Sequence, residues 1–124
     1  MKHSPAFLAL VEEVMPRIRE ISADELVELQ EKMQPLLLID VREDHEWQHG
    51  HIRGAQHLSR GILERDIETR VPDKAATVVL YCGGGFRSAL SADSMQKMGY
   101  SNVRSLAGGW REWNEKKLPV TGCN

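Results

Sequence analysis

Apolar residues recur in two alternating patterns along the chain. Short, unbroken apolar runs are typical of strands that are covered on both faces of a sheet. The segments between them carry apolar residues every three or four positions, which predicts helices with one buried face. The predicted strands are residues 18–21, 36–41, 77–81 and 102–106, and the predicted helices are residues 4–15, 22–34, 62–70 and 88–98, with a last helix between Gly109 and Pro119.

Capping and breaking residues bound several of these elements. Ser4 is expected to cap the first helix, and Ser22 with Glu25 forms a capping box at the start of the second. Gly99 is expected to end the helix 88–98. The polar stretch 42–60 is expected to be rich in loops.

The alternation of strands and helices predicts an α/β fold with an open parallel sheet. Binding sites in such sheets lie beyond the carboxyl ends of the strands. Asp40 lies at the end of the predicted strand 36–41, and Cys82 directly follows the predicted strand 77–81. We therefore expect the functional site at the sheet edge where these two residues lie.

Composition adds few constraints to this picture. The 124 residues suffice for one domain with its own core, and a net charge of −2 gives no reason to expect a nucleic acid or an anionic membrane as partner. The apolar run that follows Pro5 ends at Glu12 and Glu13, too soon for a secretory signal or a membrane span. The only cysteines, Cys82 and Cys123, form no paired framework, which suits a reducing compartment. We therefore expect a cytoplasmic protein.

The most informative stretch joins the strand 77–81 to the helix 88–98. Cys82 stands at its head and is followed by Gly83, Gly84 and Gly85. A loop without Cβ atoms can turn its N–H groups inward and cradle an anion, and the helix start that follows adds to a field that favours a thiolate. Cys82 is therefore predicted to be a nucleophile, with Arg87 pointing at the thiolate or at an anionic substrate. The alternative is a small buried cysteine beside an ordinary turn.

A second motif indicates different chemistry. His45-Glu46-Trp47-Gln48-His49 matches H-E-x-x-H, in which two histidines one helical turn apart bind zinc and the glutamate is the base. The expected helical context is missing because Gly50 follows directly, and Ile52 and Ala55 stand where the extended motif has glycine and histidine. We therefore expect no metal here. The histidines, His45, His49, His51 and His57, are expected to lie in loops and on the surface.

Asp40 and Arg42 are separated by one residue at the end of the strand 36–41. A carboxylate and a guanidinium so placed are expected to pair with each other or with loop backbone. A secondary role in shaping the mouth of the Cys82 pocket is the alternative for both residues.

Three segments in this order resemble the rhodanese-like sulfurtransferase family, and the resemblance runs from about Ile21 to Val120. It implies a three-layer α/β/α domain with a five-stranded parallel sheet over residues 21–120, preceded by a helical extension, 1–20, and followed by a tail, 121–124. The segments are Leu38-Ile39-Asp40-Val41-Arg42-Glu43 with Glu46 and Gly50-His51-Ile52-Arg53-Gly54-Ala55; Tyr81-Cys82-Gly83-Gly84-Gly85-Phe86-Arg87-Ser88; and Leu106-Ala107-Gly108-Gly109-Trp110 with Trp113 and Pro119.

The resemblance implies sulfur transfer through Cys82 without a cofactor or a metal. Cys82 would take a sulfane sulfur from thiosulfate or a persulfide and pass it from a Cys82 persulfide to cyanide or a thiol. The donor would be a small molecule, and a protein donor or acceptor is a further option. The substrate-binding residues implied are Gly83, Gly84, Gly85, Phe86, Arg87 and Ser88.

Two other functions on the same fold stay open. Cysteine-dependent phosphatases place five residues between cysteine and arginine, whereas four separate Cys82 from Arg87; the arginine keeps a phosphatase or arsenate reductase as an alternative. Non-catalytic interaction modules of the family typically lack the cysteine. Gly83 and Gly84 are neutral where thiosulfate-using members carry basic residues, so the donor is open. Cys123 is expected to be dispensable, with a role as resolving thiol as the alternative.

Overall fold

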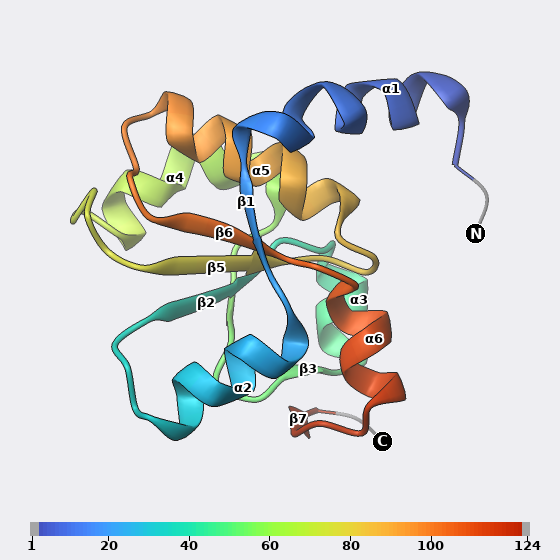
Figure 1. The fold of residues 1–124 in the computed structure, drawn as a ribbon, viewed down its shortest axis with the longest axis vertical. Coiled ribbons are helices and arrows are strands. Elements are labelled where there is room, and N and C mark those ends of the chain that lie inside the picture. The colour runs from blue at the N-terminus through green and yellow to red at the C-terminus, as the bar shows by residue number, and fades with distance from the viewer. Residues whose placement is uncertain (1–2, 123–124) are drawn as a thin grey trace.

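The computed structural model describes residues 3–122, and its centre is a parallel sheet of five strands. The strand order is β1-β6-β5-β2-β4, and every neighbouring pair runs parallel (Figure 1). The α/β class and the five-stranded parallel sheet expected from the sequence are confirmed. The strands are β1 Arg19–Ile21, β2 Leu37–Asp40, β4 Gln56–His57, β5 Val78–Tyr81 and β6 Val103–Leu106.

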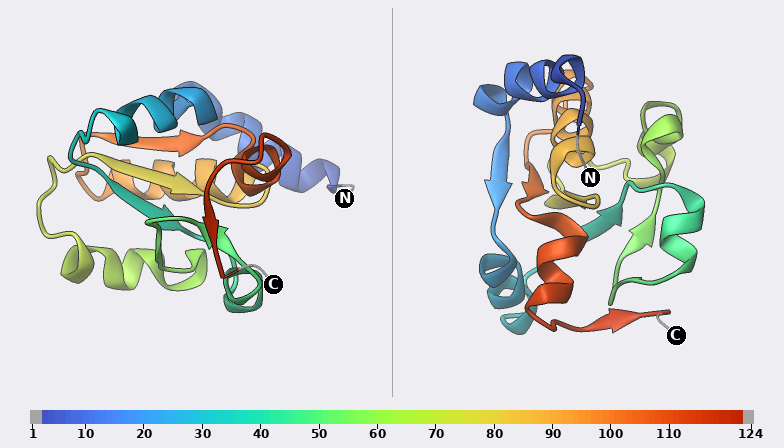
Figure 2. Two further views of the ribbon diagram at one scale, coloured as in Figure 1. Left: turned by 90° about the horizontal axis from the view of Figure 1, so that it is seen from below. Right: turned by 90° about the vertical axis from the view of Figure 1, so that its right-hand side faces the viewer.

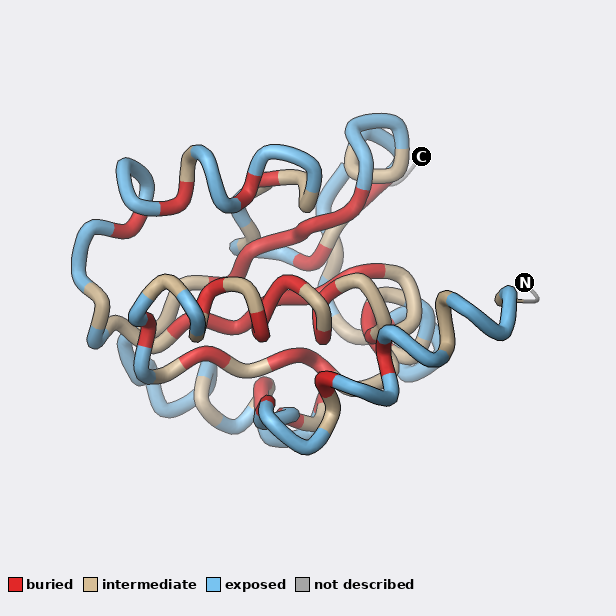
Figure 3. The backbone as a smooth tube through the Cα atoms, turned by 90° about the horizontal axis from the view of Figure 1, so that it is seen from above, coloured by how far each residue is buried: buried red, intermediate tan, exposed pale blue. Residues whose placement is uncertain are grey.

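Helices cover both faces of this sheet, which makes three layers. Figure 2 shows α2 and α5 on opposite sides of the strands. Helices α1, α4 and α5 bury side chains in one apolar cluster, and α2 and α6 do so in the other. Figure 3 shows the buried positions on the strands and the inner helix faces, with exposed positions on the outside. The helices are α1 Pro5–Val14, α2 Ala23–Glu31, α4 Arg60–Arg70, α5 Phe86–Lys97 and α6 Gly109–Glu115.

The helix caps follow the sequence. The Ser4 side chain accepts a hydrogen bond from the Phe7 N–H, and Ser22 with Glu25 makes both bonds of a capping box. A short 3₁₀ helix, η1 (Met15–Arg17), then leads from α1 to β1. Helix α5 begins two residues earlier than expected, at Phe86. Its N-cap is Gly85 with φ of 103°, a left-handed conformation that glycine adopts without steric cost.

The loop-rich stretch 42–60 also contains short elements that the sequence did not predict. This stretch holds α3 (Asp44–Gln48), β3 (His51–Ile52) and the sheet strand β4. Glu43 and Glu46 form a capping box that starts α3, and β3 pairs antiparallel with β7 (Val120–Thr121) in a second, two-stranded sheet. β7 crosses the expected boundary between the domain and its tail.

Helix α1 packs on its own domain. Val11 and Val14 are buried in the same cluster as Val78 and Leu80 of β5. Arg17 of η1 donates two hydrogen bonds to the carboxylate of Asp93 in α5, at 3.0 Å each. The apolar face of α1 is therefore buried against its own domain. Among residues 3–122, no helix combines the length and the apolar character needed to cross a membrane.

Candidate active site

Cys82 lies directly after β5, and its sulfur is surrounded by donors from the following loop. The N–H of Gly85 lies 3.2 Å and the N–H of Ser88 3.3 Å from Cys82 Sγ. The Ser88 hydroxyl is 3.5 Å away. Cys82 is 1% exposed, so these groups replace water around the sulfur. N–H groups that converge on a sulfur stabilise negative charge there.

A buried serine on the neighbouring strand supports this arrangement. Ser105 of β6 lies with its Oγ 2.8 Å from Ser88 Oγ, and both residues are fully buried. The contact fixes the hydroxyl that faces Cys82 Sγ. Sequence reasoning missed Ser105, although a serine within an otherwise buried strand was a signal, because a buried hydroxyl needs a partner.

Helix α6 holds the loop from its outer side. The N–H groups of Trp110 and Arg111 donate to the carbonyl oxygens of Cys82 and Gly83, at 2.8 and 3.0 Å. Gly109 permits this approach, because a Cβ there would stand 2.4 Å from the Cys82 carbonyl oxygen. Because those carbonyls point toward α6, the N–H groups of the loop are not used in the contact with α6. Within residues 3–122, four of them donate no hydrogen bond: those of Gly83, Gly84, Phe86 and Arg87.

Arg87 pairs with a carboxylate from α3. Its guanidinium donates to both carboxylate oxygens of Glu46, at 2.8 and 3.1 Å. This bidentate bond lowers the pKa of Glu46 from 4.5 to about 2, and it also raises the pKa of Arg87. Glu46 was singled out in the sequence only as part of a motif. Its charge balances the arginine that was expected to face the thiolate or a substrate.

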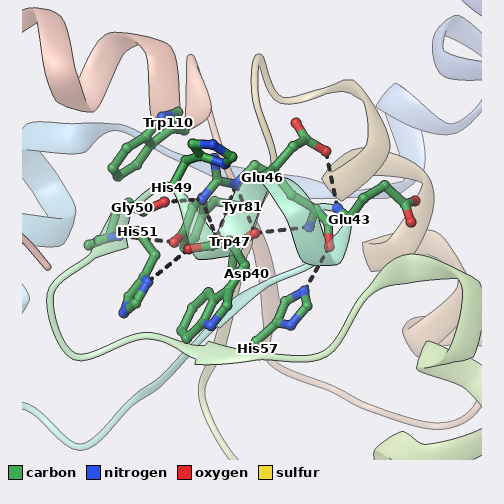
Figure 4. A network of polar contacts seen from close by, with 12 residues as sticks. Asp40, Glu43, Glu46, Trp47, His49, Gly50, His51, His57, Tyr81 and Trp110 are labelled. Atoms are coloured by element: carbon green, nitrogen blue, oxygen red, sulfur yellow. Dashed lines mark hydrogen bonds and ion pairs between the residues drawn. The ribbon is translucent and has the colours of Figure 1, made fainter. Parts of the chain in front are cut away.

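Asp40 and Arg42 form a buried ion pair next to the site. Figure 4 labels Asp40 within this network of polar contacts. The Arg42 Nη2 lies 2.7 Å from an Asp40 carboxylate oxygen, and the guanidinium also bonds the carbonyl of Gly50 at 2.6 Å. It lies 4.7 Å from the centre of the Trp110 ring. Neither member of the pair lines the cavity at Cys82. The geometry is that of a structural pair that ties β2 to the loop before β3.

The H-E-x-x-H segment does lie on a helix, contrary to expectation, but the helix is short and its histidines do not converge. Nδ1 of His49 bonds the carbonyl of His45 at 2.6 Å. The ring of Trp47 stacks with the rings of His51 and His57, which Figure 4 labels. The distance between ring centroids is 3.5 Å for His51 and 5.0 Å for His57. Within the described part of the chain, no three His, Cys, Asp or Glu side chains form a group that could hold a metal ion.

A cavity of about 650 Å³ opens onto Cys82. Its lining joins four parts of the chain, of which sequence reasoning named only the cysteine loop. Cys123 lies outside the described residues. The lining residues are His3, Ser4 and Phe7 from the start of α1; His45 and Glu46 from α3; Cys82, Gly83, Gly84, Phe86 and Arg87; and Arg111 from α6.

The chain belongs to the rhodanese family, since the family model described as a rhodanese-like domain matches residues 22–116. It is 34% identical to the thiosulfate sulfurtransferase GlpE of Coxiella burnetii, over 78% of this chain and 85% of that protein. It is 33% identical to a putative mitochondrial thiosulfate sulfurtransferase of Schizosaccharomyces pombe, over 64% of each chain. The match thus spans just under two thirds of the latter protein's length.

A solved structure extends the similarity to α1. The protein comes from Rhodopseudomonas palustris and is described as of unknown function and a possible tyrosine phosphatase. It superposes with a TM-score of 0.82 over 97% of both chains, at 26% identity. The relatives above support a sulfurtransferase family, whereas a different activity has been suggested for this structural neighbour.

Proposed function

We propose that this protein is a sulfurtransferase that carries a sulfane sulfur on Cys82, from thiosulfate or a persulfide to cyanide or a thiol. The observation that carries the proposal is the convergence of two N–H groups on Cys82 Sγ at the edge of a cavity. The relatives that are named thiosulfate sulfurtransferases support it.

The reaction would run in two displacements. The Cys82 thiolate bonds to the outer sulfur of thiosulfate as the sulfur–sulfur bond breaks, and sulfite leaves with the electron pair. The outer sulfur of the new persulfide then carries the negative charge. The unpaired N–H groups of Gly83, Gly84, Phe86 and Arg87 are available to hold that charge. Cyanide or a thiolate next bonds to the outer sulfur and returns Cys82 to its thiolate.

The geometry of Arg87 favours sulfur transfer over phosphatase or arsenate chemistry. An arginine that cradles a phosphate must offer its guanidinium to the oxyanion. Here two guanidinium nitrogens of Arg87 donate hydrogen bonds to Glu46, and the loop between Cys82 and Arg87 has only four residues. A non-catalytic interaction module would not need N–H donors around a cysteine sulfur, so the surroundings of Cys82 favour catalysis over that role.

The test is the intact mass of the wild type, Cys82→Ser and Cys123→Ser proteins after incubation with thiosulfate and, separately, with glutathione persulfide. Cyanide is then added and thiocyanate is measured. We expect one added sulfur on the wild type and on Cys123→Ser, removed by cyanide, and none on Cys82→Ser.

Absence of added sulfur on the wild type with both donors would refute the proposal and lead to phosphatase and arsenate reductase assays. Loss of persulfide turnover in Cys123→Ser would instead show that the second cysteine takes part.

A further inference from the structure

The first turn of α1 forms a wall of the cavity at Cys82, although it precedes the 22–116 span of the family model. The His3 ring lies 5.1 Å from the ring of Phe7 and 5.0 Å from that of Phe86, and the two phenylalanine rings are 6.2 Å apart. Phe86 belongs to the cysteine loop. Three rings from segments far apart in the sequence therefore meet beside the candidate nucleophile.

This wall is held in place by the core. Val11 and Val14, further along α1, are buried, and Ser4 caps the helix at the Phe7 N–H. Phe7 packs against the same apolar cluster that contains Cys82. An apolar surface at a fixed position next to a reacting sulfur can select the body of a substrate, because burial of an apolar group is favourable wherever it is removed from water.

Helix α6 contributes a positive charge to the same cavity. The Arg111 guanidinium nitrogens lie 3.8 and 3.9 Å from the place that a Cβ on Gly84 would occupy. Its backbone N–H is bonded to the Gly83 carbonyl, which fixes the residue on the loop. Unlike Arg87, which pairs with Glu46, the Arg111 side chain makes no ion pair or hydrogen bond within residues 3–122.

Size also favours an organic substrate. A cavity of about 650 Å³ lies within the range of roughly 300–1,000 Å³ that holds small organic molecules. Thiosulfate would fill a small part of it and would leave the rings of His3, Phe7 and Phe86 without a contact.

We propose that this site selects organic sulfane-sulfur donors that carry an aromatic group next to an anionic group. The aromatic group would pack on the wall formed by His3, Phe7 and Phe86, and the anion would pair with Arg111. This inference rests on the proposed sulfur transfer and names its substrate class. Benzenethiosulfonate is a donor of this kind: the Cys82 thiolate bonds to its outer sulfur, the sulfur–sulfur bond breaks, and benzenesulfinate leaves with the electron pair.

The kinetic test compares benzenethiosulfonate with thiosulfate, followed as thiocyanate formed in the presence of cyanide. We expect Phe7→Ala to lower kcat/KM for benzenethiosulfonate about tenfold relative to kcat/KM for thiosulfate, the order of effect that loss of an apolar contact produces. Phe7→Leu is expected to restore most of the loss. Leu10→Ala is the matched control, since Leu10 lies on the same helix and is 56% exposed.

A binding test separates this inference from the chemistry. It uses the Cys82→Ser protein and measures the dissociation constants of benzenesulfonate and of uncharged benzenesulfonamide by calorimetry. We expect Phe7→Ala to weaken both ligands and Arg111→Gln to weaken benzenesulfonate alone, by about fivefold.

The outcomes distinguish the two proposals. Failure of benzenesulfonate to bind, or equal donor preference in the wild type and in folded Phe7→Ala, overturns the substrate class even where Cys82 transfers sulfur. Binding with the expected pattern in a protein that accepts no sulfur supports the recognition site and refutes sulfur transfer instead. Far-ultraviolet circular dichroism shows whether each variant is folded.

Discussion

The side chain of Arg87 is committed to Glu46, and this contact sets the charge beside the cysteine loop. The sequence indicated an arginine that faces the thiolate or an anionic substrate. The structure pairs it with a carboxylate from a helix 41 positions earlier in the chain. The site therefore contains a neutral pair at this position, and Arg111 is the cavity arginine whose charge is not balanced by a partner in residues 3–122.

The Glu46–Arg87 pair predicts a pH-dependent effect on stability. The pKa of Glu46 is about 2 in the folded protein, below the usual 4.5, so the folded state favours the carboxylate. The stabilisation is present above about pH 4.5 and is lost as the pH falls toward 2. We expect Glu46→Gln to lower the free energy of unfolding at neutral pH by about 1 kcal/mol, and the difference from wild type to shrink through that acidic window.

Urea unfolding at a series of pH values measures this difference. Glu31→Gln removes an exposed carboxylate without an ion pair in the described residues and is the control. A Glu46→Gln effect that stays constant from neutral pH to pH 2 would contradict the assignment.

At the scale of elements, α6 acts as a clamp on the loop between β5 and α5. The N–H groups of Trp110 and Arg111, in its first turn, donate to the carbonyl oxygens of Cys82 and Gly83, so the position of α6 decides which way those peptides face. The sequence showed Gly108 and Gly109 as a turn before a helix. Only the packing of α6 against the loop shows that Gly109 makes room for two carbonyl oxygens.

Gly109→Ala is therefore expected to displace the loop. The new Cβ would stand 2.4 Å from the Cys82 carbonyl oxygen and 2.9 Å from that of Gly83, at a φ of +52°. Backbone atoms cannot rotate away as a side chain can, so we expect a loss of about 2 kcal/mol or more in stability and a large fall in Cys82 persulfide formation. Gly61→Ala, in α4 with open space around the new methyl group, is expected to be neutral or slightly stabilising. Chemical unfolding and intact mass measure both effects.

At the scale of the whole molecule, α1 is part of the core and also part of the site. Its apolar face joins the cluster beneath β5 and α5, while its first turn reaches the cavity. The sequence suggested a helical extension over residues 1–20 outside the family domain. The shared core predicts that this segment and the domain unfold together.

Val14→Ala tests this. Val14 is 6% exposed, and removal of its two methyl groups is expected to cost about 2 kcal/mol. Tryptophan fluorescence reports from Trp47, Trp110 and Trp113, which lie outside α1, and circular dichroism reports all helices. Both signals are expected to shift to lower urea by the same amount, whereas exposed Leu10→Ala leaves them unchanged. A loss of helical signal that precedes the fluorescence change would show that α1 unfolds by itself.

Features that depend on neighbours in the chain could be predicted from the sequence. The alternation of apolar runs and amphipathic segments determined the α/β class, and the caps at Ser4 and Ser22 act over three residues. The glycines after Cys82 indicated a loop with inward N–H groups for the same local reason. β4 escaped prediction because it consists of the two polar residues Gln56–His57 and is defined by backbone pairing with β2.

Contacts between distant segments were decided by the tertiary structure alone. Ser105 reaches Ser88 across 17 positions, and Phe7 meets Phe86 from a distant part of the chain. Arg111 reaches the cavity because α6 docks on the cysteine loop. Side-chain chemistry indicated a candidate nucleophile from the sequence. Which groups surround that cysteine follows from how the strands and helices pack, and a local pattern carries no information on that packing.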